Sequence, residues 1–250
     1  MWPYPRILAH RGGGTLAPEN TFVALRCGMR HGFRAVEFDV MLARDGVPVL
    51  MHDPALGRTV RGSGSVFEHD AADLAHMDAG GWFGPGHAGE PVPLFGAFAA
   101  FCKAHGVWMN IEIKPAPGYE LETGAAVARL TAELFADEIA AVDSARLPLL
   151  SSFSDVALAA AQANAPGLPR ACLISALEAD WERRARALGA VAIHTNHLHL
   201  TPPLAQAVKA RGFGLFCYTV NDPARAAELL SWGVDAFCTD RIDLIGPDFV

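Results

Sequence analysis

The sequence predicts an α/β fold, a closed (β/α)₈ TIM barrel in which eight parallel strands alternate with helices. Three observations favour this fold. Short apolar segments alternate with helical patterns along the chain, and about eight such strands remain when one hairpin strand is set aside. The 250 residues suit one barrel of this kind. A doubly wound open sheet is the alternative, but the missing GxGxxG fingerprint and the strand count weigh against it.

The first elements are expected to form a strand, a helix, a strand and a hairpin. A buried strand is expected at residues 7–10, and Asn20 is expected to be the N-cap of the helix that follows. Gly32 stands where a glycine commonly follows a helix end. The second barrel strand covers residues 36–40, and a tight turn joins it to a hairpin strand at residues 47–52.

Residues 54–92 break the alternation. They are rich in Gly, His and Asp and have weak periodicity, so we expect a small inserted subdomain after the second barrel strand. Residues 1–250 are expected to form a single domain that contains this insertion. The remaining elements are expected at 94–105 (helix), 107–114 (strand), 120–140 (helix), 147–152 (strand), 154–164 (helix), 170–174 (strand), 178–188 (helix), 190–195 (strand), 202–211 (helix), 213–220 (strand), 223–232 (helix) and 235–238 (strand).

The composition describes an acidic protein that can build a large core. Hydrophobic residues make up 51% and the net charge is −7, so no nucleic-acid partner is expected. The five cysteines are scattered and form no CxxC, which favours reduced thiols. Residues 1–6 carry no secretory signal pattern, and no apolar run is long enough to span a membrane. We therefore expect a cytoplasmic protein without a membrane partner, and the sequence leaves its oligomeric state open, a homodimer included.

The second barrel strand carries two carboxylates on one face. Because side chains alternate along a strand, Glu37 and Asp39 point away from the apolar residues between and beside them. Two buried carboxylates repel each other and are costly unless cations lie beside them. The strand at 107–114 repeats the pattern, with Glu112 and Lys114 on its polar face.

These polar side chains stand where the expected barrel strands end, which is where barrel enzymes place their catalytic groups. The three carboxylates of Glu37, Asp39 and Glu112 offer oxygen ligands alone, a set that suits Mg²⁺ or Ca²⁺ better than Zn²⁺. Arg11 and Lys114 are then left to face an anion, and an arginine offers a bidentate fork to phosphate oxygens.

Two histidines, His10 and His52, also stand at expected strand ends. Histidine titrates near neutrality, so such a pair can serve as general acid and general base. A metal ion, two fixed cations and two histidines together indicate phosphoryl chemistry on a diester, for which the partner is a small-molecule substrate.

Each of these features also has a purely structural interpretation. A histidine at a strand end is usually hydrogen-bonded in place, and the glycines after Arg11 could form a turn and nothing more. Glu37 and Asp39 would be solvated if their strand lay at a sheet edge, but a closed barrel has no edge. Glu112 and Lys114 could form a structural ion pair. Five other histidines have no strand-end placement and are expected at the surface: His31, His69, His76, His87 and His105.

Several short motifs stand in order along the whole chain. They are His10-Arg11-Gly12, Ala17-Pro18-Glu19-Asn20-Thr21, Glu37-Phe38-Asp39-Val40, Asp45-Gly46, His52-Asp53, Leu56-Gly57-Arg58-Thr59, Asp78-Ala79-Gly80, Trp82-Phe83, Val92-Pro93, Asn110-Ile111-Glu112-Ile113-Lys114-Pro115, Ser151-Ser152-Phe153, Tyr218-Thr219-Val220-Asn221 and Thr239-Asp240. With these motifs the chain resembles the glycerophosphodiester phosphodiesterase family. Its ending, from Trp232 to Pro247, is similar to that of cytosolic bacterial members.

The resemblance implies a barrel with a small inserted subdomain and a metal-dependent enzyme. The implied reaction is hydrolysis of glycerophosphodiesters, such as glycerophosphocholine and glycerophosphoethanolamine, to sn-glycerol 3-phosphate and an alcohol. The implied roles are acid–base catalysis by His10 and His52, binding of one Mg²⁺ or Ca²⁺ ion by Glu37, Asp39 and Glu112, phosphate binding by Arg11 and Lys114, and a substrate pocket that includes Phe153 and Tyr218.

Two other functions stay open. A related lipid phosphodiesterase, of the phospholipase or sphingomyelinase D type, would act at membranes, and the sequence lacks a basic or aromatic membrane face. A catalytically inactive barrel that binds phosphodiesters would have lost a histidine or a metal carboxylate, and none is missing here.

Overall fold

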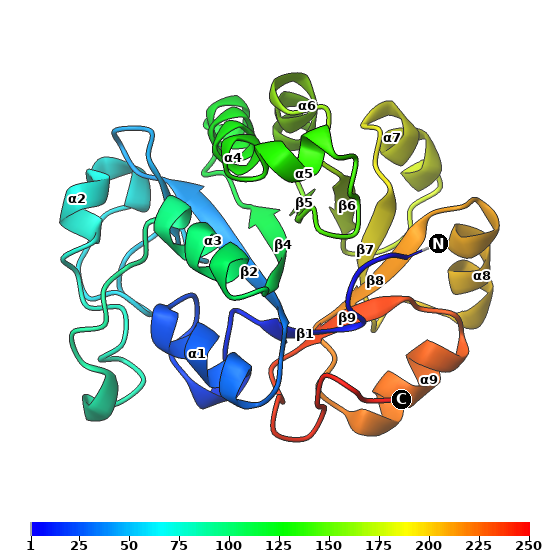
Figure 1. The fold of residues 1–250 in the computed structure, drawn as a ribbon, viewed down its shortest axis with the longest axis horizontal. Coiled ribbons are helices and arrows are strands. Elements are labelled where there is room, and N and C mark those ends of the chain that lie inside the picture. Colours follow the sequence, from blue (N-terminus) through cyan, green and yellow to red (C-terminus); the bar gives the residue numbers. More distant parts are fainter. Residues whose placement is uncertain (1) are drawn as a thin grey trace.

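A computed structural model describes residues 2–250, so Met1, the first residue of the stretch read for a signal pattern, lies outside the described residues. Nine strands form one sheet, and all but β3 run parallel and close into a barrel, because β1 pairs with both β2 and β9. The predicted (β/α)₈ barrel is confirmed (Figure 1). The barrel strands are β1 (Ile7–His10), β2 (Ala35–Leu42), β4 (Trp108–Ile113), β5 (Leu149–Ser152), β6 (Arg170–Ile174), β7 (Ala192–Asn196), β8 (Gly214–Tyr218) and β9 (Ala236–Thr239).

The predicted hairpin strand is β3 (Pro48–Leu50), which pairs antiparallel with β2. Helices cover the outer face of the barrel, as expected for parallel strands that are buried on both faces. The helices around the barrel are α1 (Phe22–Arg30), α3 (Phe95–Ala104), α4 (Glu120–Leu134), α5 (Ala136–Ala140), α6 (Asp155–Asn164), α7 (Trp181–Ala187), α8 (Pro202–Ala210) and α9 (Pro223–Ser231).

The prediction that Asn20 is the N-cap of the first helix is wrong. Thr21 is the N-cap of α1, since its hydroxyl accepts a hydrogen bond from the backbone N–H of Ala24. Asn20 is buried with a φ of 57°, and its side chain bonds to Asp39 on β2. The Asn20 side chain therefore bonds to Asp39 on a strand instead of to the backbone at the helix end.

The helix predicted at residues 120–140 is interrupted and forms α4 and α5. Phe135, with a φ of −114° and a ψ of 26°, leaves the helical conformation between them. Its ring is buried, and Lys103 Nζ lies 4.8 Å from the ring centroid. Burial of this ring in the core accompanies the break in the helix. Helix α7 is also shorter than its predicted range, beginning at Trp181.

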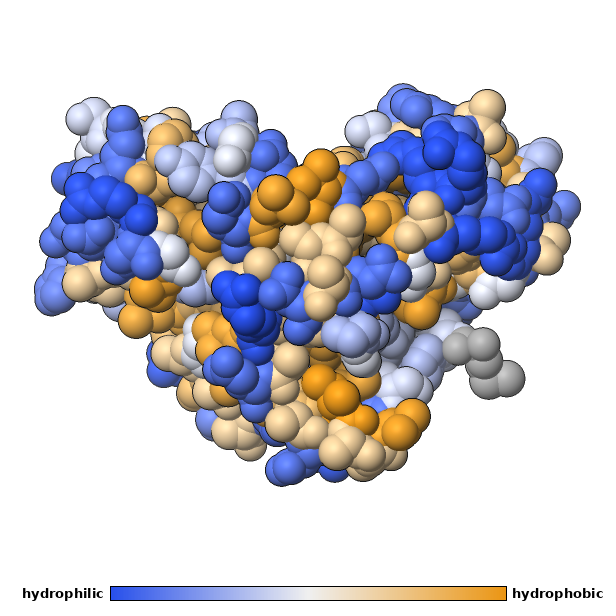
Figure 2. Space-filling view, turned by 90° about the horizontal axis from the view of Figure 1, so that it is seen from above, coloured by the Kyte–Doolittle hydropathy of each residue, from blue (hydrophilic) through white to orange (hydrophobic). Residues whose placement is uncertain are grey.

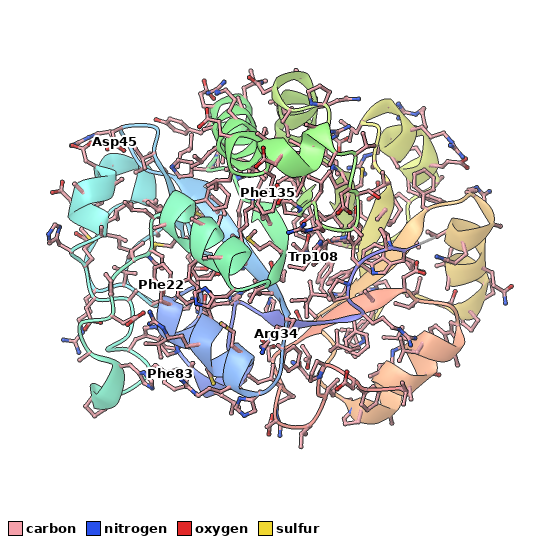
Figure 3. The ribbon with its side chains drawn as sticks, viewed as in Figure 1. Phe22, Arg34, Asp45, Phe83, Trp108 and Phe135 are labelled. Atoms are coloured by element: carbon pink, nitrogen blue, oxygen red, sulfur yellow. The ribbon has the colours of Figure 1, made fainter. Side chains whose placement is uncertain are left out.

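Between β3 and α3 the chain forms only short helices within the described residues, η2 (Val66–Glu68), α2 (Ala71–Leu74) and η3 (Pro85–His87). Val49 of the hairpin and Leu74 belong to a separate small core of this stretch. The stretch lies on one side of the barrel, next to α1 and α3, where Phe83 is labelled (Figures 1 and 3). We propose that residues 54–92 are an insertion within a single domain.

Aromatic side chains close the N-terminal end of the barrel. Tyr4 stacks on Trp108, which is labelled in Figure 3, with 4.6 Å between ring centroids. The Trp108 indole N–H donates to the Leu147 carbonyl oxygen at 2.8 Å. Leu8 and Phe216 pack in the same interior cluster and are buried. This apolar filling supports the polar residues at the opposite, C-terminal end of the strands.

One histidine, His194 on β7, lies in the middle of a strand inside the barrel. It is fully buried, and its ring stacks on Phe216 with 4.4 Å between centroids. Neither ring nitrogen has a hydrogen-bond partner among the described residues. Burial in this apolar position lowers the pKa of His194 to about 3. The ring is therefore neutral at physiological pH.

Acid is expected to destabilise the protein through His194. The unfolded chain gains a proton at this residue below pH ~6.5, whereas the folded chain resists protonation down to about pH 3. The unfolded state then binds more protons, so the free energy of unfolding falls by about 1.4 kcal/mol for each unit of pH lost in this window, or ~2 kcal/mol between pH 6.5 and 5. Urea unfolding at these two pH values should show a smaller loss for His194→Phe than for the wild type. Equal losses in both proteins would contradict this.

Candidate active site

The C-terminal ends of the barrel strands surround a cavity of about 240 Å³. Eight of the nine residues predicted for the site line it: His10, Arg11, Glu37, His52, Glu112, Lys114, Phe153 and Tyr218. The ninth, Asp39, forms ion pairs with Arg11 and Lys114. The fold therefore brings together residues that are spread over most of the chain.

Three carboxylates meet in this cavity. Glu37, Asp39 and Glu112 each offer an oxygen, and the three oxygens lie within 4.8 Å of one another. Strand pairing causes this, because Asp39 and Glu112 are direct neighbours on β2 and β4. Glu37 and Asp39 are 5% and 1% exposed, so the interpretation of a solvated edge strand is wrong. A cluster of buried carboxylate oxygens suits a hard divalent cation.

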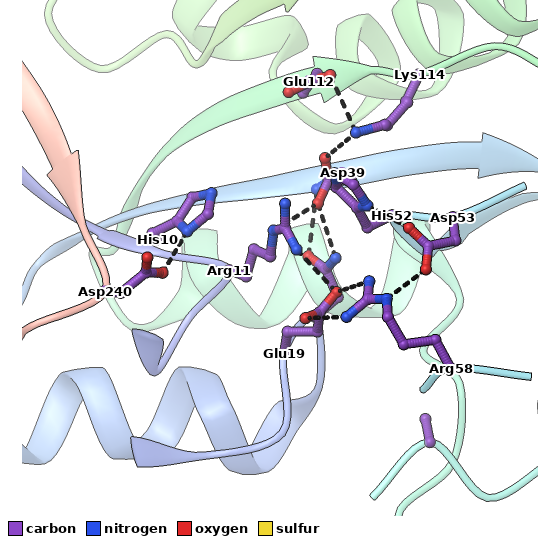
Figure 4. Close-up of polar contacts among 12 residues, drawn as sticks. His10, Arg11, Glu19, Asp39, His52, Asp53, Arg58, Glu112, Lys114 and Asp240 are labelled. Carbon is purple, nitrogen blue, oxygen red and sulfur yellow. Dashed lines mark hydrogen bonds and ion pairs between the residues drawn. The ribbon is translucent and has the colours of Figure 1, made fainter. Parts of the chain in front are cut away.

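Two basic side chains and one amide surround Asp39 (Figure 4). Arg11 Nε lies 3.3 Å from Asp39 Oδ2, and Lys114 Nζ lies 3.4 Å from Asp39 Oδ1. Lys114 Nζ also lies 3.7 Å from Glu112 Oε1. The Asn20 amide donates to Asp39 Oδ2 at 2.9 Å, and the Asp39 backbone N–H donates to Asn20 Oδ1 at 3.2 Å. Asp39 is thus the best neutralised of the three carboxylates.

Burial and charge separate the pKa values of the three carboxyl groups. Burial, together with repulsion from Asp39, raises the pKa of Glu112 to about 8. Burial likewise raises the pKa of Glu37 to about 7. Burial by itself would also raise the pKa of Asp39, but Arg11 and Lys114 outweigh it and lower the pKa below its usual value. Two of the three carboxylates therefore lack enough positive charge from the protein itself, which fits a site made for a cation.

Each of the two predicted histidines is held by an aspartate. His10 Nδ1 lies 2.5 Å from Asp240 Oδ1, and His52 Nδ1 lies 2.6 Å from Asp53 Oδ1. The other nitrogen of His10, Nε2, lies 3.6 Å from Glu37 Oε2. Burial lowers the pKa of His52. Burial lowers the pKa of His10 too, but the hydrogen bond with Asp240 and the charge of Glu37 outweigh it and raise that pKa above its usual value.

Sequence reasoning gave no role in the site to five residues that hold it in place: Glu19, Asn20, Asp53, Arg58 and Asp240. All five stand in the motifs that carry the family resemblance, and Asp240 also follows the last barrel strand, where barrel sites are built. Asn221 fixes it, because its amide donates to Asp240 Oδ2 at 2.9 Å.

Two aromatic side chains form an apolar wall of the cavity. Phe153 and Tyr218 meet edge to face, with 5.9 Å between ring centroids. The Tyr218 hydroxyl donates to the Ile174 carbonyl oxygen at 2.9 Å, so its polar group is already paired. Phe153 is 47% exposed. Seen from above Figure 1, the molecule is hollowed between two raised parts, and hydrophobic side chains gather at the base of the hollow (Figure 2).

Comparison with known proteins identifies the family. Residues 10–244 match the model of the glycerophosphoryl diester phosphodiesterase family. The chain belongs to this family. A glycerophosphodiester phosphodiesterase of Caldanaerobacter subterraneus is 29% identical over 94% of this chain and 93% of the relative, and one of Bacillus subtilis is 28% identical over 95% and 84%. The resemblance seen in the motifs is thereby confirmed.

Solved structures of glycerophosphodiester phosphodiesterases and related phosphodiesterases share this fold. A phosphodiesterase of Oleispira antarctica, solved in complex with its product sn-glycerol-3-phosphate, is 33% identical, with a TM-score of 0.85 over 94% of this chain and 93% of that chain. A glycerophosphodiester phosphodiesterase of Agrobacterium tumefaciens is 26% identical, with a TM-score of 0.76 over 96% and 98%. The chain is thus an enzyme of the glycerophosphoryl diester phosphodiesterase family.

Proposed function

We propose that this protein hydrolyses glycerophosphodiesters, the deacylated phospholipids, to sn-glycerol 3-phosphate and an alcohol. The observation that carries the proposal is the single cavity that gathers two histidines, two basic residues and two of the three clustered carboxylates, with the third in contact with both basic residues. The similarity to an Oleispira enzyme that was solved with sn-glycerol-3-phosphate supports the glycerol phosphate half of the substrate. Glycerophosphocholine and glycerophosphoethanolamine are the substrates that we expect.

Glu37, Asp39 and Glu112 are the proposed ligands of one divalent metal ion, Mg²⁺ or Ca²⁺. Their donor atoms are carboxylate oxygens, which these hard cations prefer. The raised pKa values of Glu37 and Glu112 support this assignment, because they reflect a shortage of positive charge. When bound, the ion would act as a Lewis acid that neutralises charge on the phosphoryl oxygens.

Arg11 and Lys114 are the proposed phosphate-binding residues, and His10 and His52 are the proposed acid–base pair. Arg11 and Lys114 carry fixed positive charge at the cavity wall and would orient the diester anion. One histidine would accept a proton from the oxygen that attacks phosphorus, either that of water or that of a glycerol hydroxyl that first closes a cyclic phosphate for water to open. The other histidine would donate a proton to the alcohol oxygen as its bond to phosphorus breaks. Their aspartate partners fix the ring orientation that such transfers require.

The aromatic wall is the proposed contact surface for the organic part of the substrate. Phe153 and Tyr218 line the cavity with ring faces and edges, and the Tyr218 hydroxyl is occupied by a backbone carbonyl. These rings would exclude water around the scissile ester and pack against the glycerol or the alcohol.

The proposal predicts that glycerophosphocholine or glycerophosphoethanolamine is cleaved and that diacyl phospholipid in vesicles is not. The reason is size, because a cavity of about 240 Å³ is small for a lipid with two acyl chains. A coupled assay for glycerol 3-phosphate, with Mg²⁺ or Ca²⁺ present, measures the first substrates, and release of the headgroup measures the second. Comparable rates on both would favour a lipid phosphodiesterase, and no turnover of either would favour an inactive binding barrel.

A cytoplasmic location is also proposed. All five cysteines are free and buried in the structure. Free thiols persist in reducing compartments, whereas secreted proteins commonly pair them.

A further inference from the structure

Arg58 links the insertion to the cavity through two carboxylates. It follows Gly57 and reaches back to the barrel, where Nη1 and Nη2 donate to the two carboxylate oxygens of Glu19 at 2.9 and 2.7 Å. Its third nitrogen, Nε, donates to Asp53 Oδ2. All three guanidinium nitrogens are therefore used, and the side chain is fixed between two acids (Figure 4).

Each of these two acids also holds a residue of the proposed machinery. Glu19 Oε1 accepts a hydrogen bond from Arg11 Nη1 at 3.0 Å. Asp53 Oδ1 lies 2.6 Å from His52 Nδ1. The contacts form one continuous chain that runs from the proposed phosphate-binding arginine to a proposed acid–base histidine, and Arg58 is its middle member.

Arg58 must be a cation because it lies between two acidic side chains, Glu19 and Asp53. Glu19 is a partly buried acid beside Arg11, with 13% of its side chain exposed. Without Arg58, Arg11 would be the one basic partner left to Glu19 while still sharing Asp39 with Lys114, and Asp53 would lose the partner that holds its second oxygen. Arg11 would then be drawn away from the phosphate, and the His52 ring would lose its fixed orientation.

The exposure of Arg58 distinguishes a role in aligning the site from a role in stabilising the fold. The Arg58 side chain is 45% exposed, so its removal opens no cavity in the core. Glu19 keeps its contact with Arg11 when Arg58 is removed. A loss of activity in a variant that unfolds at the wild-type temperature would therefore report geometry in the cavity rather than unfolding.

We propose that Arg58 is a positioning residue, supplied by the insertion, that aligns the phosphate-binding Arg11 and the acid–base His52 at the same time. The proposal rests on the function proposed above for these two residues. It gives the insertion a part in the reaction, since the alignment of both groups depends on a residue outside the barrel strands and the loops directly after them.

Steady-state hydrolysis of glycerophosphocholine by Arg58→Met tests the proposal. We expect kcat/KM to fall about 10²-fold, because displacements of about 1 Å in catalytic groups have effects of this size. We expect KM to rise, because a displaced Arg11 would bind the phosphate less well, and kcat to fall, because His52 would lose its orientation. Arg44→Met is the matched control, because Arg44 makes a similar two-nitrogen contact with Asp70 at the same side of the barrel, away from the cavity.

Two further variants keep the test decisive. Arg58→Lys keeps the charge, but the single nitrogen of lysine cannot span Glu19 and Asp53 as the three guanidinium nitrogens do. We therefore expect Arg58→Lys to recover only part of the loss. Glu19→Gln combined with Arg58→Met should lose less than the product of the two single effects, since both break the same chain. Thermal unfolding of every variant, which we expect to match the wild type closely, identifies any that fails to fold.

The outcomes separate this inference from the proposed function. An Arg58→Met enzyme within about threefold of the wild type, as for an ordinary surface substitution, or independent effects of Glu19→Gln and Arg58→Met, would overturn the positioning role while leaving the proposed function intact. Failure of the wild type to release glycerol 3-phosphate from any glycerophosphodiester would overturn the proposed function, and the positioning role with it.

Discussion

Replacing His10 by alanine is expected to lower kcat by about 10²–10⁴-fold, which corresponds to ~3–5 kcal/mol of transition-state stabilisation. His10 lines the cavity beside the carboxylates, and Asp240 holds its Nδ1 at 2.5 Å. Loss of the imidazole would remove a proton donor or acceptor at the reacting ester, while Asp240 would keep its hydrogen bond from Asn221. Steady-state hydrolysis of glycerophosphocholine measures the effect.

A matched substitution distinguishes this role from a general effect of losing a histidine. His76 is exposed and lies in the insertion, so His76→Ala is expected to keep normal turnover. Circular dichroism and thermal unfolding should show that both variants are folded. Near-normal turnover by a folded His10→Ala protein would remove His10 from the acid–base pair.

The second large effect is expected from Glu112→Gln, which should abolish metal-dependent hydrolysis. The substitution keeps the size of the side chain and removes one of three carboxylates whose oxygens lie within 4.8 Å of one another. A metal site that loses a charged ligand loses much of its affinity and its control over the position of the ion. Hydrolysis assayed over a range of Mg²⁺ and Ca²⁺ concentrations should show no recovery. Wild-type rates at ordinary metal concentrations would show that Glu112 is no ligand.

The positions of the three clustered carboxylates could be predicted because strands impose simple rules. Alternation put Glu37 and Asp39 on one face, and the repeat of this pattern put Glu112 and Lys114 on another. A closed parallel barrel then brings such faces together, and the pairing of β2 with β4 does so directly. Local periodicity and one fold rule were sufficient for this half of the site.

The supporting residues could not be predicted in the same way, because their contacts depend on how irregular segments fold. Arg58 lies 39 positions from Glu19 in the sequence, and its direction is set by the insertion, which has no regular period. The role of Asn20 could not be predicted from its local sequence either. Two cap-forming residues stand side by side, and only the tertiary contact with Asp39 decides that Thr21 caps the helix.

The interior histidine was not predicted from the sequence. His194 was assigned neither to the surface nor to the site, and it is fully buried in β7. The imidazole packs on Phe216 as an aromatic ring and does not serve as a titrating group. The flanking Ile193 and Thr195 are buried too, so the strand lacks the polar alternation that would have indicated which side His194 faces.

Thermal unfolding of the wild type and Glu112→Gln, each with chelator and with Mg²⁺ or Ca²⁺, tests most directly whether the carboxylate cluster is a metal site. A metal present at about 100 times its dissociation constant should stabilise the wild type by ~2.7 kcal/mol, a rise in Tm of about 5–10 °C for a domain of this size. The variant should gain much less, and in chelator it should melt no lower than the wild type, since Glu112 is a buried acid with a raised pKa. A variant that melts far below the wild type in chelator would instead make Glu112 a structural partner of Lys114, and the metal assignment would fail at that residue.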